Sequence, residues 1–271
     1  MTKTPEQIAQ EKQLERLTKR FHKACADYGL IADGDHILIG LSGGKDSLLL
    51  TELLGRRAQI YVPRFRVTAL HVRVKERDYH SDLSYLQRFC DEAKVPLLVR
   101  DVEISSPRND SPSHHESLSL RGGAGGGFEK ATSPCFLCSW FRRKELFNTA
   151  QEIGCNKIAF GHHRDDIAQT LLMNLIFQGA YATMPPILQM DKMPLQLIRP
   201  LCLIDEADII TYAAMRNYQK QTKLCPFEHV SSREKVKGLL EEIKALNPEA
   251  LDSIYGALTN IKTDYLPPCN S

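Results

Sequence analysis

A short apolar run that meets a glycine-rich turn constrains this chain more than any other feature. Residues 37–41 are apolar, residues 42–47 read Ser-Gly-Gly-Lys-Asp-Ser, and residues 48–54 are rich in leucine. This order predicts a buried parallel strand, a tight turn and a helix. The N–H groups at the start of such a helix point at a bound anion, and the helix dipole favours negative charge there. The junction therefore predicts a phosphate site, which would suit a nucleotide.

Strand and helix signals alternate along most of the chain. The predicted strands cover residues 36–42, 66–72, 96–103, 157–162 and 196–200, and the predicted helices cover residues 47–57, 79–94, 136–153, 164–178 and 205–217. Strands separated by helices require right-handed crossovers and a parallel sheet, so we predict an open doubly wound α/β fold. Ligands of such folds bind at the carboxyl ends of the strands, where residues 42–47 and Gly161 both fall.

The distribution of helix signals and glycine-rich stretches divides the chain into three predicted parts. Residues 1–33 are predicted to form a helical segment with an apolar face. Residues 34–218 are predicted to form the nucleotide-binding domain, with a flexible insertion over residues 104–133 that contains a glycine-rich tract. Residues 219–271 are predicted to form a small helical cap, because helical patterns recur near residues 231–245 and 248–262.

Two cysteines three residues apart form a second candidate site. Cys135 and Cys138 follow a Ser-Pro helix start, and residues three apart share one face of a helix, so both thiolates can point at one metal. Cys225 is a candidate third ligand. Three thiolates suit a 4Fe–4S cluster with one open iron, whereas His229 would complete a zinc site, and the pair alone could form a redox disulfide. Spacing alone leaves these alternatives open.

The composition of the chain bears on where the protein is located and on how it could contact RNA. The chain has 271 residues, eight cysteines and a net charge of +2. Its apolar runs fall short of the roughly 20 residues that span a bilayer, and its N-terminus is polar, so we expect a cytoplasmic protein without membrane contact. The small net charge argues against a global attraction to nucleic acid. Any RNA contact would use local patches, such as the N-terminal helix or Arg142-Arg143-Lys144.

The hexapeptide at residues 42–47 resembles the PP-loop of the ATP pyrophosphatases, which split ATP between its α and β phosphates. It differs from the Walker loop, because its two glycines are adjacent and an aspartate follows the lysine. The resemblance implies that Lys45 neutralises phosphate charge and that Asp46 holds Mg²⁺. It also implies that the whole hexapeptide binds the nucleotide, namely Ser42, Gly43, Gly44, Lys45, Asp46 and Ser47.

A third motif makes the resemblance closer. Residues 161–166 read Gly-His-His-Arg-Asp-Asp after a predicted strand. Together with the PP-loop and the cysteines, this motif resembles the tRNA 2-thiocytidine synthetases of the TtcA type, the tRNA-cytidine(32) 2-sulfurtransferases, over nearly the whole chain. The resemblance implies that Gly161 and His162 join the ATP site and that Asp165 is catalytic alongside Lys45 and Asp46. It further implies that a 4Fe–4S cluster is held by three cysteines, Cys135, Cys138 and Cys225.

The activity that the resemblance implies is ATP-dependent thiolation of a tRNA cytidine. The C2 oxygen of the base would be adenylated and then replaced by sulfur delivered at the cluster, with ATP, Mg²⁺ and the 4Fe–4S cluster as cofactors. The expected partners are tRNA, a cysteine desulfurase or other sulfur donor, and a second copy of the chain in a homodimer. Two alternatives are a tRNA 2-thiouridine synthetase of the same superfamily and a nucleotide-dependent RNA-binding module with structural zinc. A lysidine synthetase is disfavoured, because it has no need for three converging cysteines.

Overall fold

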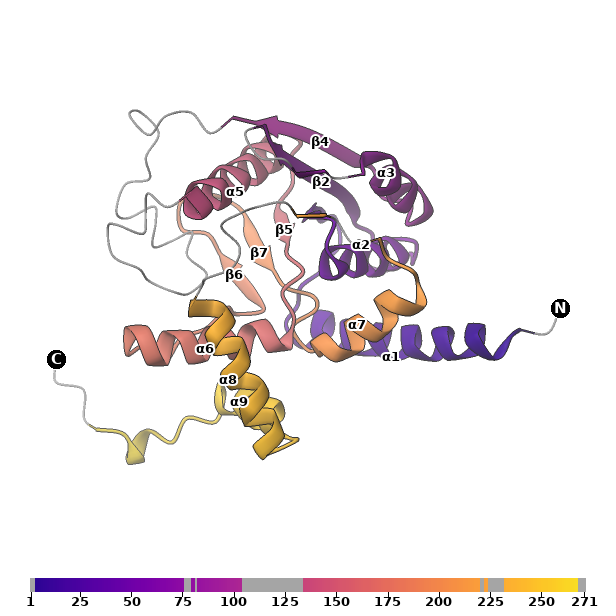
Figure 1. Cartoon of the computed structure of the whole chain (residues 1–271). Helices are drawn as coiled ribbons and strands as arrows, with labels where there is room; N and C mark the ends of the chain where they lie inside the picture. Colours follow the sequence, from indigo (N-terminus) through magenta and orange to yellow (C-terminus); the bar gives the residue numbers. More distant parts are fainter. Residues whose placement is uncertain are drawn as a thin grey trace.

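The computed structural model describes residues 3–75, 79–80, 82–103, 134–219, 222–223 and 232–267. Figure 1 shows the whole chain. In chain order its elements are α1 (Pro5–Asp27), β1 (His36–Gly40), α2 (Lys45–Ala58), β2 (Arg66–Val74), β3 (Tyr79–His80), α3 (Leu83–Glu92), β4 (Leu97–Val102), α5 (Pro134–Glu152), β5 (Lys157–Ala159), α6 (Arg164–Gln178), β6 (Ile187–Gln189), β7 (Gln196–Ile198), α7 (Glu206–Met215), β8 (Thr222–Lys223), α8 (Ser232–Leu246), α9 (Ala250–Ala257) and a 3₁₀ turn (Thr263–Tyr265).

The central sheet has the strand order β4-β2-β1-β5-β7-β6. The first five strands of this order run parallel, with Ile39 of β1 opposite Ala69 of β2 on one side and Ala159 of β5 on the other. From β1 the chain builds outward through β2 to β4, and it then returns to the other side of β1 to add β5 and β7. The direction of winding therefore reverses between β1 and β5, and ligands of open α/β sheets bind at such a switch point.

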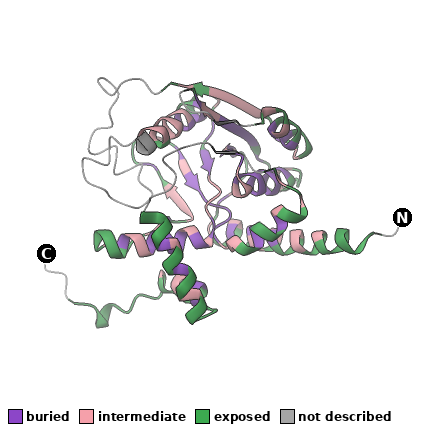
Figure 2. Ribbon diagram, viewed as in Figure 1, coloured by how far each residue is buried: buried purple, intermediate pink, exposed green. Residues whose placement is uncertain are grey.

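Side chains of β1 alternate between two cores. Ile37 and Ile39 pack in the larger cluster, with helices α1, α2 and α7, whereas Leu38 packs on the opposite face against α5. Figure 2 shows that buried residues are concentrated along the sheet and on the inward faces of these helices. Burial on both faces explains why β1 reads as a continuous apolar run rather than as an alternating one.

The predicted open doubly wound α/β fold is confirmed, and the observed sheet adds details that the sequence did not reveal. Strand β6, at one edge, runs antiparallel to β7. The helix predicted from residue 79 begins only at Leu83, because residues 79–80 form β3 and pair with β8 in a separate two-stranded sheet. The strand predicted over residues 157–162 ends at Ala159, and the residues after it leave the sheet as a loop.

Helix α1 is fixed at its start and along one face. The Thr4 side chain accepts a hydrogen bond from the Gln7 backbone N–H, and the Gln7 side chain accepts one from the Thr4 backbone N–H, which forms a capping box. Leu17, Phe21 and Ala24 are buried in the larger core cluster, as their helical spacing predicts. None of the described helices combines the length and the apolar character needed to cross a membrane. The insertion at residues 104–133 lies outside the described residues, and the three-part division of the chain stays a prediction.

Candidate active site

Residues 42–44 form a compact turn between β1 and α2, and residues 45–47 begin the helix. Gly43 has a φ of 81°, a backbone conformation that glycine adopts without strain. The hydroxyl oxygens of Ser42 and Ser47 lie 3.1 Å apart, and the Ser47 hydroxyl donates to the Gly44 carbonyl at 2.9 Å. Gly44 is the N-cap of α2 and supplies no side-chain cap, so the first N–H groups of the helix remain available for an anion.

A second loop touches this turn from the neighbouring strand. Gly161 follows β5 and packs so closely on the turn that an added Cβ would lie 3.0 Å from the carbonyl carbon of Asp46 and 3.1 Å from its oxygen. A side chain at this position would require the backbone of Asp46 to shift by a few tenths of an ångström. The structure therefore brings residues 42–47 and 161–166 together. This agrees with the prediction that both segments follow the carboxyl ends of parallel strands.

A cavity of about 350 Å³ opens where the two loops meet. Its size falls in the range of small-molecule sites. Among the residues that line it are Ser42, Asp46, His71, Arg142, His162 and Asp166. Burial lowers the pKa of His162 to about 3, so its ring is neutral at physiological pH. The His162 residue is half-buried, and its Nδ1 atom, which is itself buried, has no hydrogen-bond partner among the described residues.

Lys45 lies in a network of charges at the start of α2. Its Nζ atom is 3.1 Å from Oδ1 of Asp46 and 3.0 Å from Oε1 of Glu206, the first residue of α7. Burial opposes the charge on Lys45, but Asp46 and Glu206 outweigh it and raise the pKa of the lysine. Burial also opposes ionisation of Glu206, but hydrogen bonds from Lys45 and Lys237 bring its pKa down to about 2. Lys45 and Glu206 are therefore both charged at neutral pH.

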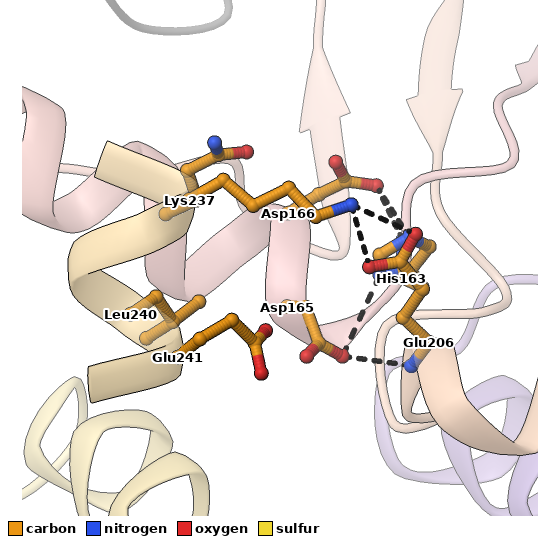
Figure 3. A pocket seen from close by; sticks show the side chains of 8 residues that line it. His163, Asp165, Asp166, Glu206, Lys237, Leu240 and Glu241 are labelled. Carbon is orange, nitrogen blue, oxygen red and sulfur yellow. Dashed lines mark hydrogen bonds and ion pairs between the residues drawn. The ribbon is translucent and has the colours of Figure 1, made fainter. Parts of the chain in front are cut away.

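The two neighbouring aspartates of the third motif occupy different surroundings, as Figure 3 shows. Oδ2 of Asp165 accepts the backbone N–H of Glu206 at 2.8 Å, and its Oδ1 lies 2.8 Å from Nζ of Lys244. Asp165 thus joins α6 to α7 and α8. Asp166, in contrast, lines the large cavity, with its Oδ2 3.3 Å from Nε2 of His163. The structure thus places Asp166 on the cavity and Asp165 at the helix junction, and a catalytic role for Asp165 stays a prediction.

A second cavity of about 40 Å³ lies between helices α6, α7 and α8. Figure 3 shows the side chains of Lys237 and Glu241 reaching toward it from α8, opposite Asp165 and His163. Asp166 lines both cavities. Helix α8 therefore contributes directly to the surroundings of the nucleotide site.

The cysteine site lies partly outside the described residues. Cys138 is half-buried near the start of α5, and Cys135 lies one turn earlier on the same helix, as their spacing predicts. The side chain of Cys135, as well as Cys225 and His229, falls outside the described part of the chain. No group of three or more His, Cys, Asp or Glu among the described residues is arranged to hold a metal ion. Helix α5 thus carries both cysteines of the pair, and their role as cluster ligands, together with Cys225, stays a prediction.

Several residues of the site were not expected from the sequence. Glu206 and Lys237 belong to no recognisable motif. Glu206 reaches Lys45 because α7 packs on α2, and Lys237 reaches Glu206 from α8. His163 and Asp166 lie inside a motif that the sequence did reveal, but their roles depend on which way each side chain points. Arg142, a candidate for RNA contact, is partly exposed and also lines the large cavity, and its contact with RNA stays a prediction.

Comparisons with known proteins agree with this geometry. Residues 10–124 match the family model described as a PP-loop domain. The chain is 33% identical over 264 residues to the tRNA-cytidine(32) 2-sulfurtransferase of Acinetobacter baumannii, covering 97% of this chain and 81% of that protein. It is 32% identical over 255 residues to the protein of the same name from Cupriavidus necator, covering 93% of this chain and 74% of the relative.

A solved structure has the same fold. It is the U34-tRNA thiolase NcsA from Methanococcus maripaludis with its 4Fe–4S cluster, which superposes with a TM-score of 0.67 at 23% identity and covers 93% of this chain and 81% of that one. This likeness shows the fold, whereas the closer sequence relatives show the family. The resemblance inferred from the three motifs is confirmed: the chain belongs to the tRNA-cytidine(32) 2-sulfurtransferases, a family of enzymes.

Proposed function

We propose that the protein thiolates a cytidine of tRNA and uses ATP to activate the C2 oxygen of the base. The observation that carries the proposal is the meeting of residues 42–47 with residues 161–166 around one cavity of nucleotide size. Membership of a family whose members are named for a tRNA cytidine supports the choice of substrate.

In the first step the C2 carbonyl oxygen attacks the α phosphorus of ATP. A new O–P bond forms, the bond between the α phosphorus and its bridging oxygen breaks, and pyrophosphate leaves. Lys45 stabilises the charge that develops on the phosphates. Mg²⁺ would be held by Asp46, and Asp166 is the second carboxylate on the same cavity.

In the second step a sulfur nucleophile at the oxidation level of sulfide attacks C2. The C–S bond forms, and AMP leaves with the former carbonyl oxygen, which gives 2-thiocytidine without a net redox change. A 4Fe–4S cluster held by Cys135, Cys138 and Cys225 would supply an iron without a protein ligand, where sulfur can bind. A cysteine desulfurase or another donor would provide the sulfur. The target base must lie in a loop or be flipped out, because C2 is inaccessible inside a paired helix.

The direct test is nucleoside analysis of tRNA from cells that lack this protein. We expect 2-thiocytidine to be absent, to return with the wild-type chain, and to stay absent with Lys45→Ala. Lys235→Ala, at an exposed position of α8, serves as the matched control and should restore the modification. Loss of a 2-thiouridine with 2-thiocytidine intact would instead identify a uridine thiolase, and unchanged nucleosides would contradict tRNA thiolation altogether.

A further inference from the structure

We propose that Lys237 is a second phosphate-binding lysine of this site and that Glu206 holds it beside Lys45 until ATP binds. This inference rests on the ATP-dependent activation proposed above. It adds a residue from the C-terminal helix α8 to a phosphate site otherwise built on the sheet.

The two lysines meet on a single carboxylate oxygen. Nζ of Lys45 lies 3.0 Å from Oε1 of Glu206, and Nζ of Lys237 lies 3.2 Å from the same atom. Lys237 also contacts Oε2 at 3.0 Å. Figure 3 shows its side chain extending from α8 toward Glu206. Since Lys45 belongs to the phosphate-binding turn, Lys237 stands next to the place where phosphate is expected.

The charges favour exchange of this carboxylate for phosphate. Two ammonium groups share Glu206, which carries a single negative charge, whereas pyrophosphate carries several charges and more acceptor oxygens. A lysine is a flexible point charge with three donors, so it can turn from a carboxylate to a nearby phosphate. The Lys237 side chain is 44% exposed and that of Lys45 is 29% exposed, which leaves both free to reorient.

Two other cations of α8 pair with carboxylates that do not contact Lys45. Arg233 pairs with Asp166 at 2.8 Å and bonds Gln169, and Lys244 pairs with Asp165 at 2.8 Å. These two cations fasten α8 to α6, on which the nucleotide motif lies. Lys237 pairs with Glu206, and Glu206 also binds Lys45 of the phosphate motif. Among the ion pairs described for α8, this is the one that connects the helix to residues 42–47.

Helix α8 does not depend on Lys237 for its position. Leu240 is 2% exposed and packs with Ala168 and Leu251, and the contacts of Arg233 and Lys244 remain when Lys237 is removed. Variants at Lys237 should therefore fold and keep α8 in place. A change in pyrophosphate or ATP binding can therefore be attributed to the Lys237 side chain and not to a displaced helix.

The test is calorimetric titration of the full chain with inorganic pyrophosphate and with ATP, each with and without Mg²⁺. We expect Lys237→Ala to weaken pyrophosphate binding about tenfold or more, as for the loss of one charge-assisted contact. Lys237→Arg should retain most of the affinity, because it keeps the charge. Lys235→Ala, on the exposed face of the same helix, is the control and should bind like the wild type.

Glu206→Gln separates phosphate binding from a merely structural role. If Lys237 binds phosphate, removing the competing carboxylate leaves pyrophosphate affinity unchanged or raises it. If Lys237 only braces α8 through Glu206, then Glu206→Gln weakens binding as Lys237→Ala does, which would overturn the inference. Wild-type affinity in Lys237→Ala would also overturn it and leave the proposed function standing. A wild-type chain that binds neither ATP nor pyrophosphate would overturn both.

Discussion

At the scale of single residues, the proton affinity of Glu206 differs between the folded and the unfolded chain. Burial disfavours its charge, but Lys45 and Lys237 outweigh burial and lower its pKa from 4.5 to about 2. A carboxylate with a depressed folded-state pKa stabilises the fold fully above its unfolded pKa, and the stabilisation disappears as the pH falls toward the folded value. The relevant window for Glu206 therefore runs from about pH 4.5 down to about pH 2.

We predict from this window that Glu206→Gln lowers the free energy of unfolding by about 2 kcal/mol near pH 6 and by clearly less near pH 3. Urea titrations of both chains at the two pH values measure the effect. The comparison with the variant removes the contribution of other acids that titrate in the same range. A difference that does not change with pH would show that the charge of Glu206 does not stabilise the fold.

Gly161 carries a second prediction at this scale. A methyl group at this position would press on the backbone of Asp46, which cannot move without displacing the phosphate turn. We expect Gly161→Ala to cost about 1–3 kcal/mol of stability and to weaken ATP binding at least tenfold, as measured by urea unfolding and calorimetry. Gly238→Ala is the matched control, because nothing lies within 4 Å of its added Cβ. That exposed helical change should stabilise the chain by about 0.5–1 kcal/mol and leave ATP binding unchanged.

At the scale of elements, α8 is the piece that connects the C-terminal region to the nucleotide site. Its buried side chains are few, namely Val236 and Leu240 among the described residues, and its ion pairs reach three acids of α6 and α7. Partly exposed ion pairs contribute little each, so the apolar contact of Leu240 should dominate its attachment.

We predict that Leu240→Ala costs about 2–3 kcal/mol, because the side chain leaves a cavity beside Ala168 and Leu251. Hydrogen exchange should show α8 opening more easily while β1 and β2 keep their protection. Leu239→Ala is the control, since Leu239 is 38% exposed, and it should change stability by less than about 0.5 kcal/mol. Equal effects of the two substitutions would mean that α8 is not anchored through its buried face.

Some of these elements could be predicted from the sequence, and others could not. The turn at residues 42–47 could be predicted because its strand, glycines and helix are contiguous, and the parallel sheet followed from alternating patterns. Strand β6 has three residues and β3 has two, too few for a periodic signal. The convergence of Lys45, Glu206 and Lys237 depends on how separate helices pack, which no local pattern encodes. Asp165 and Asp166 are identical in type and adjacent, so only the rotation of α6 decides which one lines the cavity.

At the scale of the whole molecule, the described ion pairs of Lys45 do not involve α5, although Arg142 of that helix lines the large cavity. Lys45 contacts Asp46 and Glu206, whereas Cys138 lies on a helix that packs on the other face of the sheet. Phosphate binding and metal binding should therefore respond to different substitutions.

We predict that Cys138→Ser abolishes iron binding on anaerobic reconstitution and keeps ATP affinity within about twofold, whereas Lys45→Ala keeps iron and loses at least tenfold in ATP affinity. Iron analysis and calorimetry measure the two properties on the same samples. Cys25→Ser, at a half-buried position in the core far along the chain from α5, is the control and should retain iron. Loss of both properties in either variant would mean that the two sites fold or function as one unit.

The strand order of the sheet also determines when, during synthesis, the candidate nucleotide site is complete. Residues 42–47 leave the ribosome early, but the strand that lies beside β1 on the switch-point side is β5, and Glu206 and Lys237 are translated later still. Contacts between distant parts of a chain form only after both parts are made. A nascent chain that already displays the complete phosphate motif thus lacks the Gly161 loop after β5 and the second lysine, Lys237, and competence to bind nucleotide arrives only near the end of translation.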